Sequence, residues 1–145
     1  MKIVLDDGAV MPTRAHQFDA GLDLYAPEMV VVPASYSQFG NVTVGAVTID
    51  TGVHVQIPQG CVGMLKSKSG LNCHYGITGE GVIDSGYTGS IHVKLYNHTG
   101  KAFQILRGEK ISQLVILPCV LPDLEVVDHL EDTERGTGGF GSTGR

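Results

Sequence analysis

One acidic residue stands in a glycine-rich stretch whose composition suits a rigid bend. Asp84 lies in the run 81–89, which reads GVIDSGYTG, and an aromatic residue, Tyr87, follows three positions later. Apolar residues alternate along 91–96, which indicates a half-buried strand, and residues 82–83 are its predicted hairpin partner. A carboxylate held by backbone on both sides can act as a general base. On this stretch alone, an Asp that accepts hydrogen bonds from turn amides is the more common reading.

A cluster of basic and hydroxyl residues follows a short apolar segment. Lys66, Ser67, Lys68 and Ser69 are consecutive, and residues 67–74 are the one segment that favours a short helix. The sequence predicts Ser69 as the N-cap of this helix. Amides at a helix N-terminus attract anions, whereas the alternative is a solvated basic loop. Because the chain as a whole is acidic, a local basic cluster favours an anion site.

Two further polar residues lie on predicted strands. Asp23 stands on the strand face opposite Leu22 and Leu24, and Gln113 opens an apolar strand at 113–117. Asp23 is either a solvated strand carboxylate, the more common case, or a carboxylate near a hard cation. Mg²⁺ suits the second reading because it often needs only one or two carboxylates plus substrate phosphates. Gln113 is either a strand-edge amide or a neutral donor to a phosphate oxygen.

The glycine-rich C-terminal stretch, residues 134–145, admits two readings. Its glycines match the pattern GxGxxG, but a dinucleotide site requires a preceding strand and a following helix, for which this stretch offers no pattern. A P-loop is excluded because Ser142 follows Gly141 where a lysine is required. Such composition is typical of a loose terminus. Equally, Arg135 and glycine amides can wrap a phosphate chain while Phe140 stacks on a base.

Composition narrows the function classes. The chain has 145 residues, a formal net charge of -5, 20 glycines and three cysteines. This charge argues against direct nucleic-acid binding. The cysteines lack the close spacing of a zinc or redox motif, and the six histidines show no metal-ligand spacing, so we expect free thiols in a reducing compartment. The N-terminal apolar run is too short for a signal peptide, and no run is long enough for a membrane span. These features predict a cytoplasmic protein.

Short strands dominate the predicted secondary structure. Frequent glycines favour tight turns over long helices, which indicates an all-β domain over residues 1–130 followed by a flexible arm at 131–145. The segment 35–45, from Ser35 to Gly45, is polar and is predicted to be a loop or a weak hairpin. Strands are predicted at residues 2–5, 22–25, 29–32, 47–57, 62–65, 102–106 and 113–117.

Five stretches resemble, in order, the motifs of one family, the trimeric deoxyuridine triphosphatases (dUTPases). Each stretch alone is weak or moderate, but five in the same order are highly specific, and the resemblance extends from Arg14 to Arg145. The stretches are AGLDLYA at 20–26, the segment 58–71, GVIDSGYTG at 81–89, GEKISQL at 108–114 and RGTGGFGSTG at 135–144.

The resemblance implies a fold, an assembly and a reaction. It implies a jelly-roll-like β-barrel that forms a homotrimer with three active sites, each built from three chains. The implied reaction converts dUTP and water to dUMP and pyrophosphate with Mg²⁺ as cofactor. The arm at 131–145 would close over the bound nucleotide.

The resemblance also assigns roles residue by residue. Asp84 matches the carboxylate that activates water, Tyr87 the ring under the deoxyribose, and Asp23 a carboxylate that reaches magnesium through water. Backbone groups around Val82 and Ile83 would read the uracil edge, and Phe140 would cover the base. The remaining substrate-contact positions are Lys68, Ser69, Gly70, Thr78, His92, Gln113, Arg135, Gly141, Ser142 and Thr143.

Three features depart from the family pattern. Lys68 and Lys110 stand where many relatives have Arg, and Lys lacks the bidentate fork of a guanidinium. The segment 35–45 is longer than is usual in the family, which suggests contact with a protein partner. The long segment favours one alternative to an active dUTPase, a nucleotide-sensing or protein-binding relative with incidental catalysis. A dCTP deaminase-like enzyme of the same superfamily is the other alternative, although the intact pattern of Ile83, Asp84 and Tyr87 argues against it.

Overall fold

The computed structural model describes residues 1–138 and contains many short strands with one short helix, as the composition predicts. The strands are β1 (Ile3–Leu5), β2 (Gly21–Tyr25), β3 (Val30–Val32), β4 (Tyr36–Gln38), β5 (Asn41–Thr43), β6 (Gly45–Asp50), β7 (Val53–Val55), β8 (Cys61–Lys66), β9 (Ile77–Thr78), β10 (Gly81–Ile83), β11 (His92–Asn97), β12 (Phe103–Ile105) and β13 (Lys110–Pro118), and the helix is α1 (Ser69–Tyr75). The predicted all-β class is confirmed.

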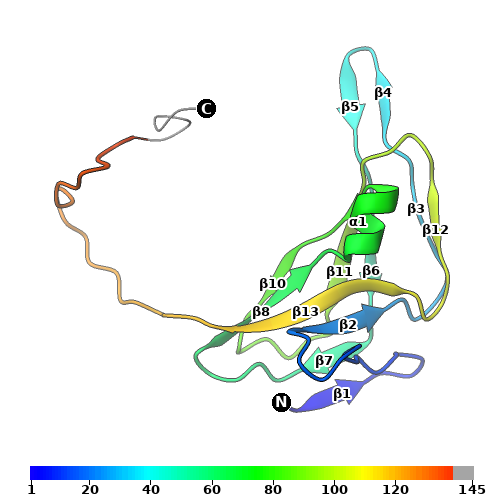
Figure 1. The fold of residues 1–145 in the computed structure, drawn as a ribbon, viewed down its shortest axis with the longest axis horizontal. Coiled ribbons are helices and arrows are strands. Elements are labelled where there is room, and N and C mark those ends of the chain that lie inside the picture. The colour runs from blue at the N-terminus through cyan, green and yellow to red at the C-terminus, as the bar shows by residue number, and fades with distance from the viewer. Residues whose placement is uncertain (139–145) are drawn as a thin grey trace.

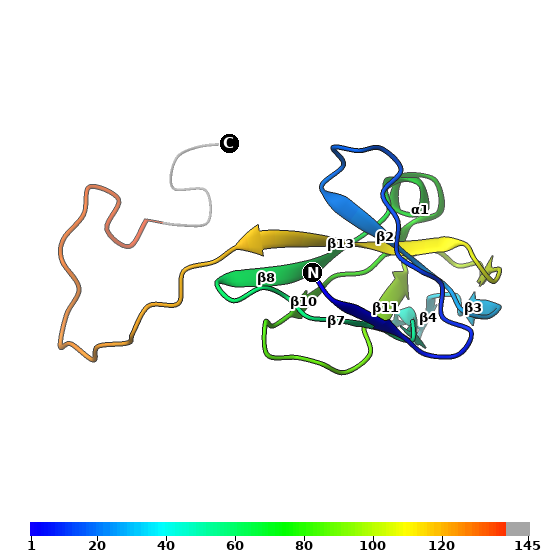
Figure 2. The same cartoon turned by 90° about the horizontal axis from the view of Figure 1, so that it is seen from below.

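The strands pair into antiparallel sheets of two to four strands. The largest has the order β10-β8-β13-β2, and a three-stranded sheet has the order β6-β11-β9. Three two-stranded sheets, β1-β7, β12-β3 and β4-β5, are the remaining sheets of the described residues. The strand pairings of the described residues do not form a closed barrel. Figures 1 and 2 show the four-stranded sheet lying over β7 and β11. The sheets thereby enclose one core in a jelly-roll-like arrangement.

The core is built from the inward-facing residues of these sheets. Leu24, Leu65 and Leu114 come from the four-stranded sheet, and Val93 and Leu95 come from β11. All five side chains are almost fully buried, and alternate residues of β11 face solvent. The period of two read from residues 91–96 is therefore a true strand signal.

The hairpin predicted around Asp84 is wrong, although both of its strands exist. β10 pairs with β8 through Ile83 opposite Gly63, whereas β11 pairs with β6 and, at its end, with β9. The segment from Asp84 to Ser90 therefore crosses between two sheets instead of turning back on its own strand. A strand's period reveals which face is buried but carries no information about its neighbour.

Helix α1 occupies the predicted place but begins differently. Its N-cap is Lys68, in an extended conformation and without a side-chain cap, so the prediction of Ser69 as N-cap is wrong. Gly76 ends the helix in the left-handed conformation with φ 63°, which glycine adopts without strain. The Tyr75 ring lies 4.8 Å from that of Phe103, which docks the last turn onto β12.

The segment 35–45 forms a hairpin that projects from the body (Figure 1). In the described part of the chain, strands β4 and β5 pair only with each other, and Phe39 at the tip is 94% exposed with φ 51°. At the base, the Ser35 hydroxyl donates to the Asn97 carbonyl at 2.5 Å and accepts from the Gly45 amide at 2.9 Å. The hairpin therefore has a fixed base and an exposed tip.

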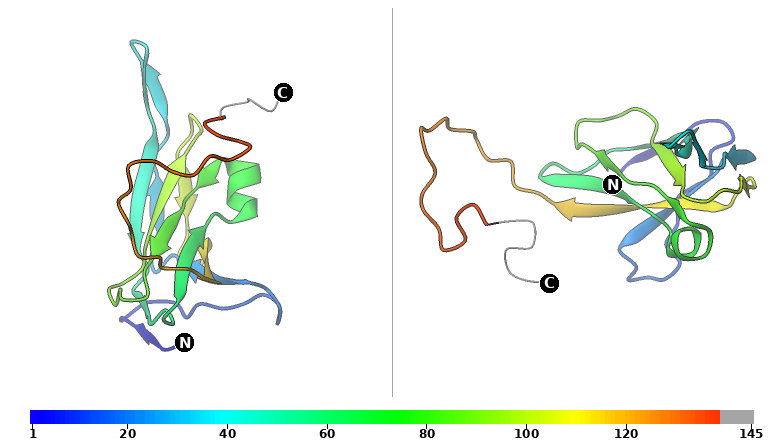
Figure 3. Two further views of the ribbon diagram at one scale, coloured as in Figure 1. Left: turned by 90° about the vertical axis from the view of Figure 1, so that its left-hand side faces the viewer. Right: turned by 90° about the horizontal axis from the view of Figure 1, so that it is seen from above.

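Regular structure ends at Pro118, and residues 119–138 run away from the sheets (Figures 1 and 3). This segment carries several large apolar side chains that are mostly exposed, with Val126 at 99%. The other most exposed apolar residues are Val120, Leu121, Leu124 and Leu130. Among the described residues, no helix is both long and apolar enough to cross a membrane.

Candidate active site

A cavity of about 240 Å³ opens where β10 ends and β11 begins. The residues that line it are Val82, Ile83, Asp84, Tyr87, Ser90 and His92. Five of these six were predicted from the sequence as parts of one site, and the structure brings those five together. Asp84 is exposed to solvent at the mouth of the cavity, where it can meet a water molecule and a ligand.

The backbone between Asp84 and Ser90 is folded by its own hydrogen bonds. The Tyr87 amide donates to the Asp84 carbonyl at 3.0 Å, which closes a turn, and the Tyr87 hydroxyl donates to the Ser90 carbonyl at 2.8 Å. The Tyr87 ring lies directly over Gly89, where a Cβ atom would collide with it. Gly89 is therefore required for this placement of the ring.

Ser90 and Asp50 belong to the site and were missed by the sequence reasoning. The Ser90 hydroxyl donates to Asp50 Oδ1, and the Gly52 amide donates to the same oxygen at 3.0 Å. The bonds from Ser90 and Gly52 lower the pKa of Asp50. His92 Nε2 lies 3.6 Å from Asp50 Oδ2, and its Nδ1 lies 3.0 Å from the Ser90 carbonyl. The apolar period of β6 predicted the strand but gave no sign of the polar contact at its end.

A second cluster centres on Asp23, which is 4% exposed, so the expectation of a solvated carboxylate is wrong. Lys68 Nζ lies 2.5 Å from Asp23 Oδ1, and Lys110 Nζ lies 2.6 Å from Oδ2. Burial alone would raise the pKa of Asp23, but hydrogen bonds from Lys110 and Lys68 and their charges outweigh it, and the pKa falls below 3.8. The same contact raises the pKa of Lys110. Two ammonium groups therefore share one buried carboxylate.

Gln113 adjoins this cluster. It lies inside β13, opposite Asp23 of β2 on one side and Lys66 of β8 on the other, so the reading as a strand-edge amide is wrong. Its Nε2 donates to the Ser67 carbonyl at 3.2 Å, and its side chain lies over Gly21, where a Cβ would collide. Ser69 and Gly70 are exposed at the start of α1, next to Lys68.

The other predicted contacts lie apart from both clusters or outside the described residues. Thr78 Oγ1 lies 2.7 Å from His98 Nε2 on the three-stranded sheet. Arg135 lies in the extended segment, where its Nε donates to the Gly138 carbonyl at 2.9 Å. Four predicted positions fall outside residues 1–138, namely Phe140, Gly141, Ser142 and Thr143.

The two clusters occupy opposite edges of the four-stranded sheet. Asp84 directly follows β10 at one edge, while Asp23 lies on β2 at the other, with β8 and β13 between them. Three strand spacings and the offset along the strands correspond to a separation of about 15 Å or more. The clusters around Asp84 and Asp23 are therefore separate sites on one chain.

The donor set around Asp23 fits a metal ion only in a limited way. In the described residues, no three His, Cys, Asp or Glu side chains are grouped as metal ligands. Both Asp23 oxygens already accept from ammonium groups. Because both oxygens are occupied, a magnesium ion at this cluster would have to be held by substrate phosphates and water.

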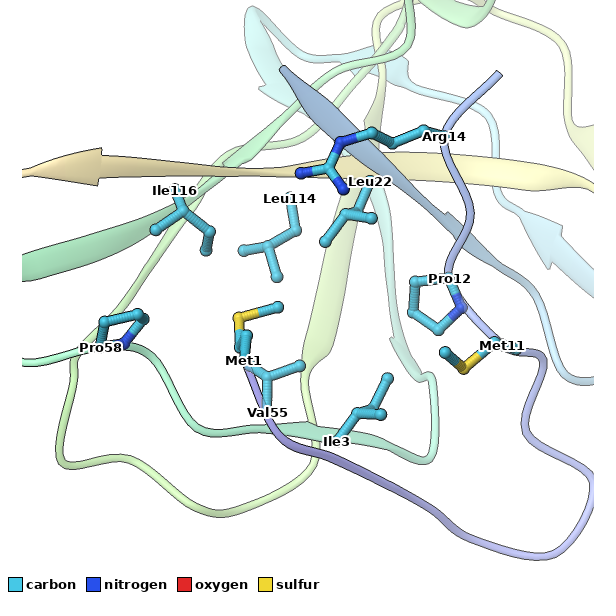
Figure 4. Close-up of a pocket in the computed structure, with 10 residues that line it drawn as sticks. All are labelled: Met1, Ile3, Met11, Pro12, Arg14, Leu22, Val55, Pro58, Leu114 and Ile116. Carbon is cyan, nitrogen blue, oxygen red and sulfur yellow. The ribbon is translucent and has the colours of Figure 1, made fainter. Parts of the chain in front are cut away.

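A different cavity, of about 360 Å³, lies between the N-terminal strand and the four-stranded sheet (Figure 4). Its walls are apolar apart from Arg14, and Ile3 of β1, Val55 of β7 and Leu114 of β13 contribute to them. It lacks the convergent polar groups that a nucleotide site requires, so it is not the candidate active site.

Comparisons with known proteins point to one family. The dUTPase family model matches residues 7–144. The deoxyuridine 5'-triphosphate nucleotidohydrolase of Paramecium bursaria Chlorella virus 1 is 42% identical over 141 residues, which are 97% of this chain and 94% of that protein. The Staphylococcus bacteriophage 80alpha dUTPase, solved with dUPNHPP, superposes with a TM-score of 0.86 at 31% identity and covers 99% of this chain and 98% of that one.

A variant of the dUTPase from S. aureus phage phi11 superposes with a TM-score of 0.77 at 30% identity, covering 90% of this chain and 98% of that chain, and is described as showing the coordination of a structural Mg(II) ion. The family match spans nearly all of the sequence, and the order of the motifs agrees with it. This chain therefore belongs to the dUTPase family.

Proposed function

We propose that this protein hydrolyses dUTP to dUMP and pyrophosphate, with Asp84 as the general base. The observation that carries the proposal is the cavity at the end of β10, which combines an exposed carboxylate, an aromatic ring and strand backbone. Such a combination can bind a base and a sugar while a carboxylate faces the first phosphate. The family membership supports the same reaction.

The base would bind at the free side of β10. Within residues 1–138, β10 pairs only with β8, so backbone groups on its other side are available as donors and acceptors. A backbone N–H beside a C=O complements the edge of uracil, which presents a carbonyl and an N–H. Val82 and Ile83 would supply these groups. This edge pairing would disfavour cytosine, whose exocyclic group is a donor.

Tyr87 would exclude ribonucleotides. Its ring is fixed by the hydroxyl bond to the Ser90 carbonyl and by contact with Gly89. A deoxyribose stacked on this ring would leave no space for a 2′-hydroxyl. His92, exposed at the rim of the same cavity, would contact the substrate from β11.

The phosphate chain would be held by the second cluster. Lys68 offers a point charge, Ser69 a hydroxyl and Gln113 an amide, and Gly70 allows close approach of backbone. Mg²⁺ bound to the phosphates would offset their negative charge and hold them in a reactive orientation. Asp23 would act toward this ion through water and toward Lys68 by direct contact. Thr78, on β9, lies apart from this cluster and stays a predicted contact to the uracil edge.

The chemical step would be an in-line displacement at the α-phosphorus. Asp84 accepts a proton from a water molecule as the water oxygen bonds to that phosphorus. The bond from the α-phosphorus to the bridging oxygen breaks, and pyrophosphate leaves. A positioned general base contributes roughly 10²–10⁴-fold to such a rate.

The complete site would require a homotrimer. The clusters around Asp84 and Asp23 lie at opposite edges of one sheet, so each site would combine edges from neighbouring chains. The extended segment 119–138 exposes a run of apolar residues that a monomer in water leaves uncovered. Packed on a second copy, it would bring Arg135, and with it Phe140, Gly141, Ser142 and Thr143, to another chain's site as a closing arm. The free thiols of Cys61, Cys73 and Cys119 suit a cytoplasmic location.

A pyrophosphate-release assay with dUTP, dCTP, UTP and dTTP tests this proposal. We expect release from dUTP alone, and sedimentation should give the mass of three chains. Ammonia release from dCTP would instead favour a deaminase-like enzyme. Equal turnover of dUTP and dCTP would contradict the proposed base site.

A protein-binding role for the β4–β5 hairpin is a second candidate. The observation that favours it is the exposed apolar tip, where Phe39 is 94% and Val42 72% exposed. A fixed base with an exposed aromatic tip suits insertion into a partner's pocket. The variant Phe39→Ser should keep full dUTP turnover while losing the partner in a pull-down, with Glu28→Gln as the control. Retention of the same partner by both variants would contradict this role.

A further inference from the structure

One histidine outside the active site links the residue that follows β1 to the segment between Asp84 and Ser90, called here the substrate loop. His54, on β7, places Nδ1 2.9 Å from the Thr88 carbonyl oxygen and Nε2 3.1 Å from Asp6 Oδ2. Asp6 directly follows β1, and its own amide donates to the Gly52 carbonyl at 2.9 Å. The imidazole therefore bridges two segments that are 82 positions apart in sequence, Asp6 and Thr88.

Both partners of this imidazole are acceptors. A carbonyl oxygen and a carboxylate oxygen offer lone pairs and no hydrogen, so each contact needs an N–H on the ring. Neutral imidazole carries one N–H, whereas the imidazolium carries two. Only the charged form of His54 satisfies both contacts at once.

The Thr88 carbonyl directly follows Tyr87, whose ring is the proposed contact of the sugar. The loop is tied down before Thr88 by the turn between Asp84 and Tyr87, and after it by the Ile91 amide, which donates to the Val53 carbonyl at 2.8 Å. Among the hydrogen bonds of the described residues, the contact with His54 is the one that ties Thr88 to the body of the domain. Loss of this contact would release the backbone next to Tyr87.

The charges around His54 favour the imidazolium. Asp6 faces it from the turn after β1, and Asp50 faces it from the end of β6, while Lys2 shares a shallow cavity with it and opposes them. The bond to Thr88 and the bond and charge of Asp6 raise the pKa of His54 above 6.5, against a smaller effect of burial. The doubly protonated ring therefore persists to higher pH than in a free histidine.

We propose that His54 is a positioning residue whose imidazolium holds the Tyr87–Gly89 segment in its substrate-binding form, so that affinity for the deoxynucleotide falls as the ring loses its proton. This inference rests on the proposed dUTP site at Tyr87. Since the ring does not reach the cavity lining, it acts through the Thr88 backbone. The bridge is present below the folded-state pKa of His54 and is lost as the pH rises through it.

Three variants separate this role from a merely structural one. His54→Ala removes the bridge at every pH. Asp6→Asn replaces the carboxylate by an amide whose N–H can donate to Nε2, so a neutral ring can still donate from Nδ1 to Thr88. His74→Ala, on the exposed face of α1, is the matched control.

The measurement is KM and kcat for dUTP from about pH 6 to about pH 9, the range in which histidines titrate. At each pH we take the ratio of the KM of the native chain to the KM of Asp6→Asn. We expect this ratio to rise about threefold to tenfold as the pH increases across the range, which corresponds to the loss of one hydrogen bond. His54→Ala should show the raised KM throughout, with kcat almost unchanged. Because both proteins are compared at the same pH, the effect of substrate ionisation on KM is the same for both and cancels in the ratio.

A second measurement does not depend on turnover. Nitrogen NMR of His54 should show both ring nitrogens protonated at the acid end of this range, and the amide signals of Thr88 and Gly89 should shift as the ring loses its proton. A ring that is singly protonated even at about pH 6, or a KM ratio that is flat across the range, would overturn the inference. Absence of dUTP turnover in the native chain with an intact NMR titration would overturn the proposed function instead.

Discussion

Lys68 Nζ lies 2.5 Å from Asp23 Oδ1, and Lys110 Nζ lies 2.6 Å from the other oxygen of the same carboxylate. The lysine predicted to hold a phosphate is thus oriented by a buried acid before any ligand arrives. Its side chain is a quarter exposed, so solvent still reaches part of it. An arginine at position 68 would reach Asp23 with a planar fork and present a different face to the phosphates.

Substitution of Asp23 tests this arrangement through stability. Asp23→Asn should destabilise the fold by about 1.5–3 kcal/mol at neutral pH, because a charged hydrogen bond is lost at a buried site. The pKa of Asp23 is lowered, so its contribution is present above the unfolded-state pKa and is lost as the pH falls below about 4. Urea unfolding at several pH values should show this acid slope in the native chain.

The comparison with the variant gives the control. In Asp23→Asn the part of the acid slope that comes from this group should be absent, whereas the exposed Glu28→Gln should behave like the native chain. Equal acid slopes in the native chain and in Asp23→Asn would contradict the paired carboxylate. Denaturation should be run at one protein concentration, because an oligomer's stability depends on it.

Asp84→Asn should keep the dUTP site and lose the chemistry. An amide cannot accept the proton of the attacking water, so we expect kcat to fall by roughly 10²–10⁴-fold. Calorimetric binding of a non-hydrolysable dUTP analogue should be almost unchanged. Turnover at the native rate in this variant would remove Asp84 from the role of base.

Tyr87 should select the sugar through its ring and not through its hydroxyl. Tyr87→Ala opens the space beneath the sugar, and we expect the preference for dUTP over UTP to fall by at least about tenfold. Tyr87→Phe keeps the ring and loses only the bond to the Ser90 carbonyl, so the preference should be largely retained. The check is kcat/KM for both nucleotides, and equal preference in the native chain and in Tyr87→Ala would exclude the proposed selection.

Two glycines of one loop should respond differently to the same change. A methyl group on Gly89 meets the Tyr87 ring, whereas around Gly86 no atom lies within 4 Å of the corresponding position. Gly89→Ala should therefore raise KM for dUTP by displacing the ring, while Gly86→Ala should leave KM near the native value. Steady-state kinetics of both variants decide, and identical KM values would mean that the ring is not held against Gly89.

Local patterns in the sequence predicted much of this molecule. The alternation at 91–96 gave a true strand, β11, and the stretch around Asp84 gave five residues of one cavity. Those residues are close in sequence, so short-range reasoning suffices for them. The motif order also identified the family, which no single stretch could do.

Contacts over long sequence distances were not predictable in this way. β10 and β11 flank one loop but belong to different sheets, because each pairs with the strand that completes the core and not with its nearest neighbour in sequence. The alternation at Leu22 and Leu24 suggested that Asp23 faces solvent. Lys68 and Lys110, 45 and 87 positions later, cover it. Which strands pair and which side chains meet is therefore decided by the folded structure and not by local sequence patterns.

The division of polar groups between the two edges of the sheet β10-β8-β13-β2 has a genetic consequence. If each site takes its general base, Asp84, from one chain and its phosphate-binding residues from another chain, two inactive variants can restore activity when they assemble together. Co-expression of Asp84→Asn with Lys68→Ala should yield mixed assemblies in which some sites inherit both intact halves. Such intersubunit complementation would be measured as turnover that neither variant shows alone. It would demonstrate that one active site contains residues from two chains.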